Sequence, residues 1–132
     1  MTMGEYPDRG QQHPPTPTRE LCTVLLESGR THLEGGQFEQ AHSALGHALA
    51  LARASDSPDL LHRALASLGQ LHLRCRRYDE ARQALEEAAA APQSDEMVVA
   101  RSLIDLAEAN RHLGRLNDAE RAARYARREG FY

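Results

Sequence analysis

Histidine is the residue type in this sequence most able to bind a metal ion, and seven histidines occur among the 132 residues. Two metal-ligating histidines on one helix face need a spacing of four residues, whereas His42 and His47 are five apart. His32 and His72 fall inside predicted helices, where a half-buried ring with one hydrogen-bonded nitrogen is the expected role. With no HExxH motif, no cluster of cysteines and no carboxylate triad, the sequence predicts no metal site and no cofactor.

The two cysteines, Cys22 and Cys75, are the candidate thiol nucleophiles. Cys75 stands among Arg74, Arg76 and Arg77, and a cysteine beside arginines can be reactive when it is exposed. A small buried packing residue is the more ordinary role, and it is the one that we expect for Cys75. The pair forms neither a CxxC motif nor a disulfide framework, which favours a reducing cytoplasm.

Other catalytic patterns are missing from the sequence. The acidic pairs Asp79-Glu80 and Glu86-Glu87 fit solvated helix faces better than an acid–base pair. Gly35-Gly36 ends a predicted helix, whereas a phosphate-binding GxGxxG motif opens a helix after a strand. We therefore expect that the protein is not an enzyme.

The elements that position these residues are repeated helix pairs. Residues 68–88 read as two helices joined by a tight turn, and such a hairpin needs neighbours of its own type to bury both faces. Three copies of the pattern align in register: a small residue, an aromatic or leucine nine positions later, and an alanine three positions after that. The aligned residues are Gly29, Gly69 and Ala107; Phe38, Tyr78 and Leu116; and Ala41, Ala81 and Ala119.

At these positions the chain resembles the tetratricopeptide repeat family, whose motif places Leu-Gly in the first helix, an aromatic at the start of the second and alanine three residues later. The residues that carry the resemblance are Leu68-Gly69, Tyr78 with Ala81, Gly36 with Phe38, and Ala48-Leu49. The chain departs from the motif at its early aromatic, which is His32, His72 and Asn110, and at the glycine before the turn, which is Arg76 in the second copy. The repeat step of 38 to 40 residues exceeds the usual ~34 and resembles a long-period variant.

The resemblance implies an all-α fold, an α-solenoid of three antiparallel helix hairpins wound as a right-handed superhelix. We expect one such domain over residues 18–132, with repeats at about 19–54, 58–91 and 95–129. Residues 1–17 are polar and rich in glycine and proline, which predicts a flexible arm or, alternatively, a docking peptide for another chain. Within the domain, Ser57 followed by Pro58 is predicted to cap the third helix.

The last predicted helix, from residue 117 to about 128, leaves two interpretations of the C-terminal end open. Its arginines favour a self-capping helix, that is, one whose polar outer face covers the end of the repeat array without a further helix. Leu116, Tyr125, Phe131 and Tyr132 would alternatively form an apolar edge that pairs with another chain. This second interpretation allows a homo-oligomer through the end helices.

The resemblance also implies a concave groove, lined by the second, fifth, ninth, twelfth and thirteenth positions of each first helix. In this sequence we expect contacts from Leu26, Arg30, Leu33, Arg63, Gln70, Leu73, Arg74, Arg101, Ile104, Glu108, Arg111 and His112, accompanied by Thr23, Glu34 and Ala66. Five of the fifteen are arginines and two are acidic. Arginine binds carboxylates in a bidentate manner, so the set predicts a peptide with acidic and aliphatic side chains. The alternative is that the arginines pair with Glu34, Glu108 and their helix neighbours, leaving no net basic groove.

Some family members hold a C-terminal carboxylate in a clamp of basic and amide side chains. The corresponding slots here are Leu26, Arg30, Ser67, Arg101 and Asp105. Only Arg101 fits, so a chaperone adaptor is disfavoured.

Composition narrows the function classes. The net charge is −3 with interleaved acids and bases, which argues against nucleic-acid binding. No apolar run reaches the ~18 residues of a membrane span, and the N-terminus lacks a signal peptide pattern. We therefore expect a cytoplasmic scaffold or adaptor that binds a peptide segment of a partner protein. A ligand- or peptide-sensing module acting on a separate effector, or a homo-oligomeric assembly unit, are the alternatives.

Overall fold

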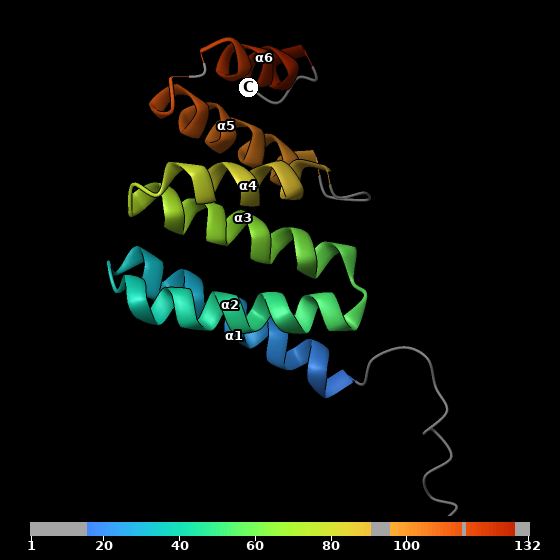
Figure 1. The fold of residues 1–132 in the computed structure, drawn as a ribbon. Coiled ribbons are helices and arrows are strands. Elements are labelled where there is room, and N and C mark those ends of the chain that lie inside the picture. The colour runs from blue at the N-terminus through green and yellow to red at the C-terminus, as the bar shows by residue number, and fades with distance from the viewer. Residues whose placement is uncertain (1–15, 91–95, 115, 129–132) are drawn as a thin grey trace, which may run out of the picture.

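Six helices make up the described part of the computed structural model, which covers residues 16–90, 96–114 and 116–128 without the side chains of residues 16, 17 and 116–119. They are α1 (Thr16–Glu34), α2 (Phe38–Ser55), α3 (Pro58–Arg74), α4 (Tyr78–Ala90), α5 (Glu96–His112) and α6 (Leu116–Arg128). Consecutive helices pair as the hairpins α1–α2, α3–α4 and α5–α6, and the hairpins stack in chain order (Figure 1). The predicted α-solenoid of three hairpins is confirmed. The predicted arm at 1–17 lies outside the described residues except for Thr16 and Pro17, which already belong to α1.

A glycine against a leucine joins the two helices of each of the first two hairpins. A Cβ placed on Gly29 would lie 2.4 Å from Leu45 Cδ2, and one on Gly69 would lie 2.5 Å from Leu85 Cδ2. Both leucines are completely buried. Since real Cβ atoms do not approach carbon so closely, any larger residue at either position would force the facing leucine to shift. The two small residues predicted as equivalent therefore have the same packing role.

A side-chain hydrogen bond also recurs in the first two hairpins. Cys22 Sγ donates to Ala48 O at 3.3 Å, and His62 Nδ1 lies 2.7 Å from Ala88 O. Each pair is 26 residues apart, and both donors are buried. Burial raises the pKa of the Cys22 thiol, with an opposing effect of the Arg63 charge, so the thiol is protonated and suited to donate.

The turns within the first two hairpins share one hydrogen-bonding scheme. Gln37 N donates to His32 O and Arg77 N donates to His72 O, both at 2.8 Å, which closes a Schellman-type helix end. The turn needs a residue in the left-handed region: Gly36 has φ 77° and Arg76 has φ 62°. Arg76 therefore adopts the conformation that the family pattern assigns to glycine, at some conformational cost.

The hairpins are held together by a mainly apolar interior. One cluster joins the first and second hairpins and includes Leu26, Leu45, Leu60 and Leu71. A smaller cluster of Ala81, Leu85, Leu106 and Ala109 joins the second and third. Cys75 packs against the first cluster, as expected, but it is half-buried where a buried residue was predicted. The predicted cap is confirmed, because Ser57 Oγ accepts from Leu60 N at 3.3 Å with Pro58 in the first turn.

The outer face of α6 is only partly apolar. Tyr125 is 44% exposed, Arg124 and Arg128 are exposed, and Ala126 is buried. Of the predicted apolar edge, Phe131, Tyr132 and the side chain of Leu116 lie outside the described residues. The interpretations of a self-capping helix and of an edge for a second chain both remain predictions.

Candidate functional site

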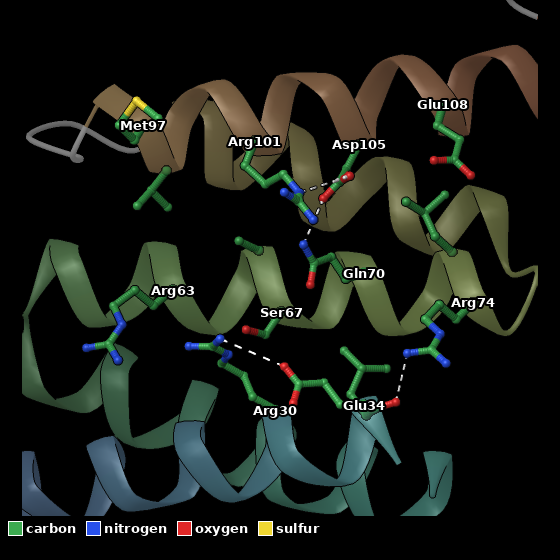
Figure 2. Close-up of a pocket in the computed structure, with 14 residues that line it drawn as sticks. Arg30, Glu34, Arg63, Ser67, Gln70, Arg74, Met97, Arg101, Asp105 and Glu108 are labelled. Atoms are coloured by element: carbon green, nitrogen blue, oxygen red, sulfur yellow. Dashed lines mark hydrogen bonds and ion pairs between the residues drawn. The ribbon is translucent and has the colours of Figure 1, made fainter. Parts of the chain in front are cut away.

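A cavity of about 760 Å³ lies between the first helices of the three hairpins, α1, α3 and α5. The three helices run in the same direction, so their N-terminal halves share one end of the cavity and their C-terminal halves share the other (Figure 2). Its walls combine charged and apolar side chains: Arg30, Leu33 and Glu34 from α1; Arg63, Ala66, Ser67, Gln70, Leu73 and Arg74 from α3; Met97, Val98, Arg101, Asp105 and Glu108 from α5.

The cavity contains most of the predicted contact residues. Eight of the twelve line it, and the accompanying Glu34 and Ala66 do so as well. The eight are Arg30, Leu33, Arg63, Gln70, Leu73, Arg74, Arg101 and Glu108.

Four predicted contact residues do not line the cavity. Leu26 was wrongly assigned to the groove: it is 1% exposed and belongs to the apolar cluster between the first two hairpins. Ile104 is half-buried away from the cavity, and Arg111 and His112 are exposed beyond its end. The ring of His112 instead stacks on Tyr78, with centroids 4.3 Å apart and planes at 5°. Of the accompanying residues, Thr23 is also absent from the walls, and its hydroxyl donates to Arg19 O at 3.1 Å.

Four lining residues were not predicted as contacts: Ser67, Asp105, Met97 and Val98. Ser67 and Asp105 each follow a predicted arginine, Arg63 or Arg101, by four residues, and a spacing of four places side chains on the same helix face. That spacing could have identified them. Met97 and Val98 lie in the first turn of α5, where only the stacking of three hairpins turns them toward the cavity.

The cavity arginines make long ion pairs with acids on their own helices. Arg30 lies 4.0 Å from Glu34, Arg63 lies 4.0 Å from Asp59, and Arg101 lies 3.8 Å from Asp105. The side chains of Arg30 and Arg101 are 63% and 68% exposed and that of Arg63 is 36% exposed, and solvent-accessible pairs contribute little to stability. The cavity wall therefore has four arginines against three carboxylates, which is close to the predicted alternative of a groove without a large basic excess.

Arg74 differs from the other cavity arginines because it has a structural role. Its Nη1 donates to Leu33 O at 2.8 Å, and its guanidinium carbon lies 5.3 Å from the centroid of the Phe38 ring. Leu33 is in the last turn of α1, and its carbonyl also accepts from Gly36 N at 3.1 Å in the turn that follows. Arg74 thus connects the first and second hairpins, and its substitution would disturb packing as well as the groove.

Asp105 is the least exposed carboxylate of the cavity, with 12% of its side chain exposed. Its Oδ2 accepts from Gln70 Nε2 at 3.2 Å. Burial raises the pKa of the Asp105 carboxyl above its ordinary value; the Gln70 hydrogen bond and the Arg101 charge oppose the rise, and Glu108 adds to it. A buried carboxylate with a single hydrogen bond of 3.2 Å retains the capacity to accept further donors from a ligand.

Several of the described histidines make contacts within the fold. His32 is half-buried, with Nδ1 2.7 Å from Gln37 Oε1. The ring of His72 meets His42 edge-on at 6.0 Å, and burial lowers the pKa of His72 despite the opposing effect of Glu80. Among the described residues, no group of three or more histidine, cysteine or acidic side chains is arranged to hold a metal ion.

The fold and the cavity define a class of protein, a helical-repeat domain whose first helices form a concave surface. Residues 62–95 match the sequence model of the tetratricopeptide repeat. The structure is similar to the crystal structure of the TPR domain of Arabidopsis FLU, with a TM-score of 0.77 and 23% identity over 86% of this chain and 97% of that one. No curated protein matches the sequence. The predicted resemblance to the tetratricopeptide repeat is borne out by the family model over residues 62–95, and the structural similarity confirms the predicted fold across the domain.

No helix in the described part of the chain combines the length and the apolar character needed to cross a bilayer.

Proposed function

We propose that the protein is a non-catalytic interaction module of the cytoplasm, which binds a peptide segment of a partner protein in the cavity between α1, α3 and α5. The tetratricopeptide repeat is in general a protein-interaction fold, and concave solenoid surfaces are the usual binding faces of such arrays. The observation that carries the proposal is the cavity itself, because its size and its mixture of apolar floor and charged rim suit a short peptide.

Apolar side chains form the floor on which a peptide would lie. Leu33, Ala66 and Leu73 come from two adjacent helices, and Met97 and Val98 extend the surface at one end of α5. Met97 is 69% exposed, and the flexible side chain of methionine can adapt to ligands of different shape. The charged rim would then select among peptides of similar apolar content.

The test is selection from a library of random peptides displayed on phage, followed by affinity measurements with the fluorescein-labelled peptides obtained. Ala66→Trp places a large ring in the cavity, because Ala66 lines it at the middle of α3. Ala50→Trp is the matched control, since Ala50 is exposed on α2 and does not line the cavity.

We expect Ala66→Trp to weaken binding of the selected peptides by at least about tenfold, roughly the loss of one well-packed contact region. Ala50→Trp should leave their affinity unchanged. Circular dichroism would establish that both variants are folded. Equal affinity for both variants would move the binding site away from the cavity and overturn the proposal.

A further inference from the structure

The junctions between the hairpins use positions that recur along the chain with the repeat. At the first junction, α3 contributes six side chains to the apolar cluster that joins the first and second hairpins. They are Leu60, Leu61, Ala64, Leu68, Leu71 and Cys75. The corresponding positions of α1, which lie 40 residues earlier and form the outer side of α1, are Glu20, Leu21, Val24, Ser28, Thr31 and Gly35.

The outer side of α1 is open in the described part of the chain. Leu21 is 45% exposed and Val24 is 57% exposed. The residues equivalent to Val24 in the other two first helices, Ala64 and Ser102, are completely buried. The fold therefore buries this position at both internal junctions and leaves it uncovered on α1, which lies in the first hairpin of the stack (Figure 1).

At each internal junction, the second helix of one hairpin packs against the first helix of the next. At the start of α2, the Phe38 ring centroid lies 5.3 Å from the guanidinium carbon of Arg74, at the end of α3. At the start of α4, the ring of Tyr78 stacks on that of His112, at the end of α5. Because the start of each second helix meets the end of the next first helix, the two helices run in opposite directions.

α6 is the second helix of the last hairpin, and the same side of it is open among the described residues. In α2 this side includes His42, which meets His72 edge-on, and Leu49, which packs against the first apolar cluster. The equivalent residues of α6, 78 positions later, are Glu120 and Arg127, and both are exposed. These two residues mark the outer side of α6.

From this equivalence we infer that the outer side of α6 binds the outer side of α1 of a second copy of the chain, in the manner of the junctions inside the molecule. The two sides differ, so the contact is head-to-tail and every assembly keeps one open side of each kind. Copies therefore add one after another, and each addition continues the solenoid. Neither outer side lines the peptide-binding cavity, and the inference does not depend on the proposed function.

Opposite charges favour this pairing. The contacts at the start of α2 set an antiparallel register that places Leu49 level with Ala64. Between copies, the equivalent pair is Arg127 with Val24. The methylene chain of Arg127 can cover Val24 while its guanidinium pairs with the carboxylate of Glu20, one helical turn away on the same side of α1.

The contact between copies is expected to be weaker than the junctions within the chain. Three leucines of α3 at the first junction correspond to polar residues of α1, which are Glu20, Ser28 and Thr31. Less apolar area is therefore buried, so association should depend on a high protein concentration.

Sedimentation velocity of the full chain at concentrations up to about 1 mM tests the contact, because a dissociation constant of this size corresponds to a weak interaction. One variant blocks the outer side of α1 by Leu21→Arg with Val24→Arg, which brings arginines opposite Arg127. The other blocks the outer side of α6 by Glu120→Arg with Arg127→Glu, which brings a carboxylate opposite Glu20 and leaves the net charge unchanged. The substituted side chains are all exposed, and circular dichroism would establish that both variants are folded.

The matched control is Tyr125→Glu, which adds a charge to an exposed residue elsewhere on α6. Tyr125 is equivalent to Glu87 of α4, whose carboxylate pairs at 3.0 Å with Arg53 of the preceding hairpin. The position therefore lies away from the outer side of α6, and this variant should associate as the wild type does.

We expect the mean mass of the wild-type chain to rise progressively with concentration, beyond that of a dimer. Each blocked variant alone should remain a monomer, because it keeps only one functional side. An equimolar mixture of the two blocked variants should form a dimer of one copy of each and nothing larger, since only one pair of intact sides is left.

Other results would overturn the inference. A wild-type chain that stays monomeric at about 1 mM would exclude a second copy as the occupant of the outer side of α1. Association that ends at a dimer, or that the α1 variant loses and the α6 variant keeps, would indicate a symmetric contact between two copies of α1. A mixture that remains monomeric, or an effect of Tyr125→Glu as large as that of the α6 variant, would place the contact elsewhere.

Discussion

The first two hairpins and the third solve the same packing problem in different ways. In the first two, a glycine receives a leucine from the second helix, at Gly29–Leu45 and Gly69–Leu85. The equivalent positions of the third hairpin, with the same spacing of sixteen residues, are Ala107 and Ala123. The third hairpin thus has alanine where the first two have glycine, and alanine again where they have leucine. The comparison predicts that the two positions act as a pair, because a Cβ at the first position and a leucine at the second would occupy the same space.

The side-chain hydrogen bond that recurs in the first two hairpins also distinguishes them from the third. Cys22 and His62 each donate to the carbonyl of a residue 26 positions later. The third hairpin has Ala100 at the equivalent position, and alanine has no side-chain donor. The first two hairpins thus have both the glycine–leucine contact and the side-chain hydrogen bond between their helices. The third hairpin has neither of them at the equivalent positions.

The largest effect that the comparison predicts is for Leu85→Ala. Leu85 is completely buried and fills the space that Gly69 leaves, so its truncation should lower the free energy of unfolding by about 2–5 kcal/mol. Urea denaturation followed by circular dichroism measures this loss. A loss below about 1 kcal/mol, the usual size of a surface effect, would mean that the glycine–leucine contact is not central to the second hairpin.

The next effect is for Gly69→Ala, whose Cβ would lie 2.5 Å from Leu85 Cδ2. We expect a loss of about 1–3 kcal/mol from overpacking, despite the better helix propensity of alanine. In the Leu85→Ala background the same substitution should become stabilising, because it recreates the alanine pair of the third hairpin.

The control for this cycle is Ala107→Gly, which has no leucine opposite. It should cost only the ~0.5–1 kcal/mol of a glycine in a helix. If Gly69→Ala destabilises equally in both backgrounds, the two positions are independent and the comparison fails.

A smaller effect is predicted for His62→Phe, which keeps an aromatic ring but removes the donor to Ala88 O. The N–H that the helix would supply to this carbonyl belongs to residue 92, which is proline and has none. Leaving the buried carbonyl unpaired should cost about 1–3 kcal/mol in thermal or urea unfolding. Exposed His47 provides the matched control, and His47→Phe should have little effect. Equal stability of both variants would exclude a role for the hydrogen bond.

The smallest effect concerns Asp105, at the contact between the second and third hairpins. Because burial raises its pKa in the folded state, the folded protein holds more protons than the unfolded chain between the two pKa values. The contribution of Asp105 to stability therefore falls as pH rises from the ordinary carboxyl value to the raised one. Asp105→Asn should be more stable than the wild type above this window and should lose the advantage below it. Melting temperatures from pH 4 to pH 8 test this, and a difference independent of pH would contradict it.

The repeat pattern was sufficient to predict the helices and their pairing. The registers of glycine, aromatic residue and alanine placed the turns near 35–37, 76–77 and 114, and the structure has them there. Such features depend on neighbours in sequence, through helix periodicity, caps and turn residues. Even the unusual Arg76 was visible as a departure from the family's glycine, although its positive φ of 62° was not.

The groove could be predicted only in part, because it is formed by three helices that are about 40 residues apart in the chain. The family positions identified Arg63, Gln70 and Arg101, but the same positions placed Leu26 on the groove when it is a core residue.

What the sequence specified is therefore the set of side chains and the helix on which each one lies. Which of them remain exposed, and which of them come together around the cavity, depends on how the hairpins stack. Burial and electrostatic field are sums over residues from different hairpins, so they exist only once those hairpins have been brought together.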